Sequence, residues 1–253
     1  MTDLAVLAFG FGVMPLAAIL LYAFPGLFLR HREVSWGILA GVVGFLGLSH
    51  AMALVLFNHS QLGDRTLATV LSVLGLGVGA GLGWLLLDGP YIRTEPNRIL
   101  VASVAFVALH SFGDGLVIGA SFLGGVSTTL PLDAVPVSAT VVHRFVEGAI
   151  IVVPAIAAAW RSRPAFPLLF PALLSVPAAY VPIWLVDVYG FTPIRSVIDH
   201  SIPTFASAVE ATLALFLVAR AFLPLASVER GTRWLAWTAL GFIGISLVHF
   251  LVE

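Results

Sequence analysis

Residues 66–87 read TLATVLSVLGLGVGAGLGWLLL, an apolar run without a single charged side chain. A helix of this length is about 30 Å long, which matches the hydrocarbon thickness of a bilayer. Such a helix satisfies its backbone hydrogen bonds internally, as lipid requires, and the run lacks the alternating pattern of a membrane β-strand. The stretch therefore predicts a transmembrane helix.

Apolar runs of similar length fill the rest of the chain. Of its 253 residues, 60% are hydrophobic and 10% are charged, whereas soluble domains carry about 25% charged residues. We therefore expect one all-α transmembrane domain, residues 1–253, with about eight spans and no soluble domain. The sixth run holds five prolines, so that helix should be kinked or broken. The predicted spans are roughly 4–29, 35–57, 66–87, 98–123, 136–160, 164–186, 198–222 and 232–252.

The placement of arginine predicts the orientation. All 12 basic residues are arginines, and basic loops face the cytoplasm. One set of loops and flanks holds Arg30, Arg32, Arg93, Arg98, Arg161, Arg163, Arg220, Arg230 and Arg233. The other set holds only Arg65 and Arg195. We therefore expect both termini outside, with the plasma membrane as the favoured location.

The composition also bounds the partners and the chemistry. The chain has no cysteine, which excludes disulfides, thiolate metal sites and thiol catalysis. No run of basic residues suggests nucleic acid as a partner. The lipid bilayer is the expected surrounding, and a homodimer is left open as the assembly.

Two predicted spans carry matching polar motifs. Residues 110–115 read HSFGDG and residues 143–148 read HRFVEG. Within each motif the histidine and the acid are four residues apart, so they share one face of a helix. His110 lies about 12 residues from the cytoplasmic start of its span, and Glu147 about 13 from the cytoplasmic end of its own, so they should be level. By the same reasoning Asp114 should be level with His143.

If the two faces meet, two imidazoles and two carboxylates converge near the bilayer midplane. An ionised side chain there costs about 2.5–3.5 kcal/mol on insertion scales, and a bound dication would offset that cost. Imidazole together with carboxylate suits zinc, iron(II), manganese or cobalt, whereas copper(I) prefers sulfur. We therefore predict a metal site formed by His110, Asp114, His143 and Glu147. The divalent metal ion would be the substrate, and no organic cofactor is expected.

The two motifs resemble the fourth and fifth helices of the ZIP (Zrt/Irt-like) divalent metal transporters, which each carry a His-x-x-x-acid-Gly motif. The resemblance extends to eight spans and outward-facing termini. It implies an inverted-repeat bundle, a metal path between the fourth and fifth spans, and a first metal subsite at the four residues named above. Inverted repeats with sites at the midplane are a general feature of transporters.

The sequence departs from the family where many members bind a second metal. Those ligands would fall at Ser111 and Arg144; serine is a poor replacement for asparagine, and arginine cannot ligate a metal. We therefore expect one metal. Arg144 should pair with a carboxylate, Glu210 being the first candidate, or act as a tethered cation that tunes affinity. The predicted sixth span also lacks a carboxylate, and residues 88–97 lack a histidine that could buffer metal.

Two further histidines are accessory candidates. His50 lies in the second predicted span, and His200 lies near the outer start of the seventh. Either could be a further ligand or line the entrance, with a packing role as the alternative.

Other functions stay open on the same residues. A metal-dependent intramembrane hydrolase would need an open coordination position and a general base, but no span contains H-x-x-x-H or H-E-x-x-H. A haem carrier using His110 and His143 is disfavoured because a carboxylate lies one turn from each histidine. A transport-inactive metal sensor on the same fold is the remaining alternative. We expect a transporter and not an enzyme.

Overall fold

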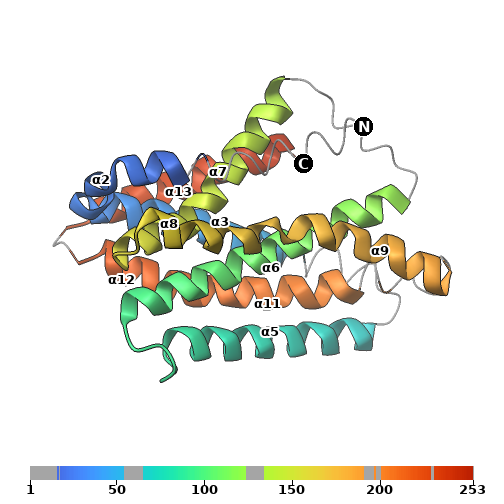
Figure 1. The fold of residues 1–253 in the computed structure, drawn as a ribbon. Helices are drawn as coiled ribbons and strands as arrows, with labels where there is room; N and C mark the ends of the chain where they lie inside the picture. Colours follow the sequence, from blue (N-terminus) through green and yellow to red (C-terminus); the bar gives the residue numbers. More distant parts are fainter. Residues whose placement is uncertain are drawn as a thin grey trace.

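The computed structural model describes residues 16, 18–53, 65–123, 134–190, 197, 201–228 and 231–252. All regular structure in these ranges is helical, which confirms the predicted all-α class. The long helices, of which α5, α6 and α11 run side by side in Figure 1, are α3 (Arg32–Ala53), α5 (Arg65–Leu87), α6 (Glu95–Leu123), α7 (Ala134–Ala157), α9 (Ser175–Tyr189), α11 (Ile202–Leu217) and α13 (Arg233–Val252). The short elements are α2 (Pro25–Arg30), α8 (Ser162–Ala165), the 3₁₀ helix η2 (Phe166–Leu174), the π-helical turn η4 (Val218–Phe222) and α12 (Leu223–Ala226).

Within the described ranges, five helices are long and apolar enough to cross a membrane: Arg32–Met52, Arg65–Leu87, Glu95–Leu116, Ile202–Ala226 and Arg233–Phe250. They overlap the second, third, fourth, seventh and eighth predicted spans, and they indicate a membrane-embedded protein. α7 covers most of the fifth predicted span. Half of the first predicted span, 4–29, lies outside the described residues, so the total of eight crossings stays a prediction.

The predicted interruption of the sixth run is confirmed. The chain passes from α8 through η2 into α9, so a 3₁₀ stretch replaces one continuous helix. Pro171 lies inside η2 and Pro182 inside α9. Proline has no amide hydrogen to donate to the preceding turn, which explains why an α-helix does not run through this segment.

Glycines let α5 pack closely against α11. Gly75, Gly79 and Gly83 are buried on one face of α5 at intervals of four residues. A methyl group added at Gly75 would lie 2.6 Å from the carbonyl oxygen of Phe205, and one at Gly79 would overlap the carbonyl oxygen of Val209. Small residues at this spacing allow helix backbones to approach in membranes. This contact fixes the position of α11, which carries Glu210.

The segments that carry most of the arginines gather at one end of the bundle. There, α2, α8 and α12 lie near the connection between α5 and α6 (Figure 1). Arg220 donates to Asp88 at 2.6 Å, and Trp160 Nε1 donates to Asn97 Oδ1 at 3.0 Å. The second bond ties the residues after α7 to the start of α6. The two motif helices are thereby linked at that end.

The core lies between α3, α6, α7 and α11. The largest fully buried apolar side chains there are Val43, Leu46, Leu100, Phe106, Ile150, Ile151, Leu213, Leu217 and Phe222. α6 packs against α7, α9, η2 and α11, so its middle is surrounded by protein. His110 lies in this middle, and its side chain is only 2% exposed.

Candidate metal centre

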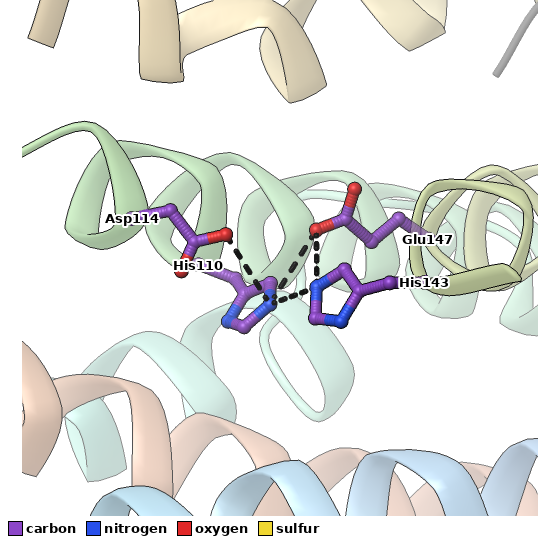
Figure 2. Close-up of side chains that lie close together, drawn as sticks. All are labelled: His110, Asp114, His143 and Glu147. Carbon is purple, nitrogen blue, oxygen red and sulfur yellow. Dashed lines mark hydrogen bonds and ion pairs between the residues drawn. The ribbon is translucent and has the colours of Figure 1, made fainter. Parts of the chain in front are cut away.

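The two motifs bring their four polar side chains together, as predicted. His110 and Asp114 project from α6, and His143 and Glu147 project from α7 (Figure 2). His110 Nε2 lies 3.3 Å from His143 Nε2 and 3.4 Å from Glu147 Oε1. His143 Nε2 lies 3.2 Å from Glu147 Oε1, and His110 Nε2 lies 3.9 Å from Asp114 Oδ2. We call these four residues the first ligand group.

Arg144 closes the first ligand group on one side. Its Nη1 donates to both carboxylate oxygens of Glu147, at 2.9 and 2.8 Å, and its Nη2 donates to Asp114 Oδ2 at 3.5 Å. The guanidinium therefore neutralises part of the negative charge of the two acids. The prediction that Arg144 pairs with Glu210 is therefore wrong, because its carboxylate partners are Glu147 and Asp114. Glu147 lies three residues along the same helix from Arg144, and a pair at that spacing meets on the helix surface.

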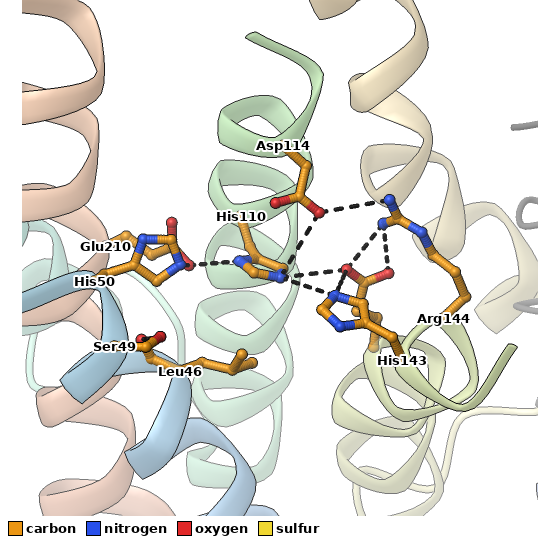
Figure 3. Close-up of polar contacts among 9 residues, drawn as sticks. Leu46, Ser49, His50, His110, Asp114, His143, Arg144 and Glu210 are labelled. Atoms are coloured by element: carbon orange, nitrogen blue, oxygen red, sulfur yellow. Dashed lines mark hydrogen bonds and ion pairs between the residues drawn. The ribbon is translucent and has the colours of Figure 1, made fainter. Parts of the chain in front are cut away.

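Glu210 instead lies on the opposite side of His110 (Figure 3). Its Oε1 is 2.8 Å from His110 Nδ1 and 3.0 Å from His50 Nε2. The three side chains come from α11, α6 and α3, and their potential ligand atoms lie within 4.8 Å of one another. We call His50, His110 and Glu210 the second ligand group. His110 thus belongs to both groups.

The hydrogen bond to Glu210 determines what His110 can offer to the first ligand group. A carboxylate only accepts, so His110 Nδ1 is the donor in this bond. In a neutral imidazole the lone pair is then on Nε2, which points at His143 and Glu147. A carboxylate behind a histidine in this way orients the ring and makes it a better metal ligand. Glu210 therefore leaves the lone pair of His110 Nε2 available toward the first ligand group.

Exposure varies steeply across the centre. The side chain of Asp114 is 30% exposed and that of His143 is 11% exposed, whereas Glu147 is only 1% exposed. On the other side, His50 is 20% exposed and Glu210 is 3% exposed. The most enclosed atoms thus belong to His110, Glu147 and Glu210. An ion reaching them would lose most of its water.

The accessory candidates have different outcomes. His50 joins Glu210 beside His110, as part of the second ligand group. Ser111 is fully buried next to His110 in α6. His200 lies outside the described residues, so its role stays a prediction. The geometry brings the four predicted ligands together, while their role as ligands also stays a prediction.

One contact of the centre had no strong signal in the sequence. The ring of His249, in α13, stacks on the ring of His143 with centroids 6.2 Å apart. Phe45 of α3 meets the ring of His249 edge to face, with ring centroids 5.5 Å apart. His249 stands near the end of the chain and far from either motif, so only its ionisable character in an apolar helix could have singled it out.

The comparisons with known proteins do not extend this description. No protein-family model matches the chain, and no curated protein matches its sequence.

Proposed function

We propose that the chain moves a divalent transition-metal cation, most favourably zinc, across the membrane through the first ligand group. Iron(II) and manganese suit the same donors. The proposal includes a bundle of eight spans with a ZIP-like inverted repeat. The cation is the substrate, and the chain is not proposed to be an enzyme.

The observation that carries this proposal is the spacing of three ligand atoms. Zinc binds imidazole nitrogen and carboxylate oxygen at about 2.0–2.1 Å, so ligands at the corners of a tetrahedron are about 3.3–3.4 Å apart. His110 Nε2, His143 Nε2 and Glu147 Oε1 lie 3.2–3.4 Å from one another. They therefore form one face of a zinc-sized tetrahedron. Asp114 is near enough to complete it after a small movement.

The two histidines differ in a way that suits a transient site. His110 has Glu210 behind it, which strengthens it as a ligand. His143 Nδ1 is buried without a hydrogen-bond partner in the described part of the chain. Because it lacks that support, His143 should hold an ion less firmly. The more exposed Asp114 and His143 would then receive the ion, and His110 and Glu147 would hold it at the enclosed position.

Arg144 supports a second candidate function. Its two hydrogen bonds to Glu147 compete with metal coordination by the same oxygens. If this pair is not displaced, the protein would bind metal weakly or not move it, as in a transport-inactive metal sensor on the same fold. If the arriving ion displaces Arg144 from Glu147, the competition lowers the affinity for the metal and so favours its release. Flux measurements separate the two functions.

The test is metal uptake into proteoliposomes that contain the purified full chain. Zinc, iron(II), manganese and cadmium are offered in parallel, and His143→Ala is compared with the wild type. We expect uptake by the wild type and a loss of at least tenfold in the variant. A second variant, Arg144→Gln/Glu147→Gln, removes a carboxylate ligand together with its buried cation, so no unpaired charge of that pair remains. It should also lose uptake.

The matched control is His31→Ala, which removes an exposed histidine outside the centre. Its uptake should equal that of the wild type. Full uptake by His143→Ala would contradict a path through the first ligand group. Metal binding without any flux in the wild type would favour the sensor.

A further inference from the structure

The second ligand group has the donor set of a metal site. It combines two imidazoles with one carboxylate, and three protein ligands with an open position are a common arrangement for zinc. His50 Nε2 and His110 Nδ1 both contact Glu210 Oε1, at 3.0 and 2.8 Å. Ligands of one zinc ion lie about 3.3 Å apart, so these contacts would lengthen by less than about 1 Å. Rotation of one carboxylate can supply this change.

His110 can serve only one group at a time. A neutral imidazole has one lone pair, and its other nitrogen carries a proton. When Nε2 binds an ion in the first ligand group, Nδ1–H donates to Glu210. When Nδ1 binds an ion in the second ligand group, Nε2–H can donate to Glu147, whose Oε1 is 3.4 Å away. Each carboxylate thus supports the ring while the ion is on the other side.

The net charge of the centre also favours one bound ion at a time. Across both ligand groups and Arg144, three carboxylates and one guanidinium leave a net charge of −2 while the imidazoles are neutral. One dication balances this charge. A second would leave two positive charges in a poorly hydrated interior, where such an excess is costly. The centre is therefore suited to a single ion.

We infer that His50, His110 and Glu210 form a second binding position for the same divalent ion, used in alternation with the first ligand group. The inference rests on the proposed metal function and adds a position between α3, α6 and α11. When the ion moves from the first ligand group to the second, it leaves Nε2 of His110 and binds Nδ1 of the same ring. The net change in the ring is the transfer of one proton from Nδ1 to Nε2, so no proton is gained or lost and the charge of the ring does not change.

The experiment measures cadmium binding by equilibrium dialysis, using the full chain in lipid nanodiscs. The first-group variant is His143→Ala/Arg144→Gln/Glu147→Gln, which leaves Asp114 and Glu210 and so keeps the net charge at −2. The second-group variant is His50→Ala/Glu210→Gln, whose glutamine can still accept a hydrogen bond from His110. A third protein combines all five substitutions, and His31→Ala is the control. Size-exclusion chromatography and circular dichroism establish that each protein is folded.

We expect one cadmium per chain in the wild type, in each of the two group variants and in the control, and none in the combined variant. The second-group variant should bind about 10- to 100-fold more weakly, because His110 loses its supporting carboxylate. In the first-group variant, X-ray absorption at the cadmium edge should still show two imidazole ligands.

Four outcomes would overturn the inference or the function on which it rests. A folded first-group variant that binds no cadmium would mean that the second ligand group only positions His110, and the proposed function would stand. Two ions bound at once by the wild type would refute alternation. No binding by the wild type, or a folded second-group variant that binds none, would contradict the first ligand group and the proposed function as well.

Discussion

Replacing Arg144 by glutamine should strengthen metal binding, since the guanidinium lies close to the ion that Glu147 would hold. Arg144 Nη1 is 2.9 Å from Glu147 Oε1, and an ion bound to that oxygen would lie about 2 Å beyond it. A separation of about 5 Å gives a repulsion of about 6–7 kcal/mol between a dication and one positive charge at an effective dielectric constant of about 20. Movement of Arg144 away from the ion relieves part of it. We expect a gain of about 10- to 1,000-fold in affinity, or about 1.4–4 kcal/mol.

Isothermal titration of zinc into purified wild-type and Arg144→Gln protein measures this gain. The substitution also leaves Glu147 and Asp114 without their cation, and breaking a buried pair costs about 3–5 kcal/mol. The metal-free variant should therefore melt at a lower temperature, and zinc should restore much of the loss. The matched control is Arg220→Gln, whose side chain is 58% exposed and pairs with Asp88; exposed pairs contribute about 0–1 kcal/mol. Equal or weaker zinc binding by a folded Arg144→Gln protein would refute the proposed placement of the ion.

Three further predictions concern packing, topology and metal choice. Gly79→Ala should lower the free energy of unfolding by about 1–3 kcal/mol, because the added methyl group meets the backbone of α11. Gly77→Ala, which has open space around it, should not lower it. Equal melting temperatures of the two variants would contradict the packing of α5 against α11. The chain has no cysteine, so a single introduced cysteine reports which side of the membrane its residue faces. In intact cells a membrane-impermeant maleimide should label Asp187→Cys but not Ser162→Cys. The reverse labelling would show that the predicted orientation is inverted. Copper(I) should be carried at least tenfold more slowly than zinc in the uptake assay, since the centre lacks sulfur; equal rates would exclude the proposed donors.

The first ligand group could be predicted from sequence because helix geometry fixes it locally. A spacing of four residues places His110 above Asp114 and His143 above Glu147, and the hairpin-like order of the two spans sets their depths. The interruption of residues 164–186 was equally local, since proline cannot donate the backbone hydrogen bond of a helix. In both cases the relevant atoms belong to one helix or to consecutive ones.

The second ligand group could not be predicted because it depends on contacts between distant helices. His50 and Glu210 were recognisable as polar residues in apolar runs, but their depth does not reveal which neighbour they face. α6 is apolar on nearly all sides, so no polar stripe shows that His110 also faces α11. The glycine face of α5 determines the position of α11, and a glycine has no side chain whose polarity could indicate its partner.

The prediction for Arg144 failed for a different reason. Adjacent residues lie about 100° apart around a helix, so Arg144 need not face the same groove as His143, and Glu210 on a distant span was its first candidate partner. Glu147 is only three residues away, and the long arginine side chain reaches it within one turn. The sequence therefore offered a local partner for Arg144. This partner, Glu147, is the same acid that was predicted to be a metal ligand.

The most direct test of the account is zinc uptake by His110→Ala, because His110 is the only residue that both ligand groups share. Proteoliposomes with the wild type, His110→Ala and His31→Ala are compared at equal protein density, with folding checked by circular dichroism. The account predicts that uptake falls to the protein-free background in His110→Ala and is unchanged in His31→Ala. Wild-type uptake by His110→Ala would show that the ion does not pass through this centre.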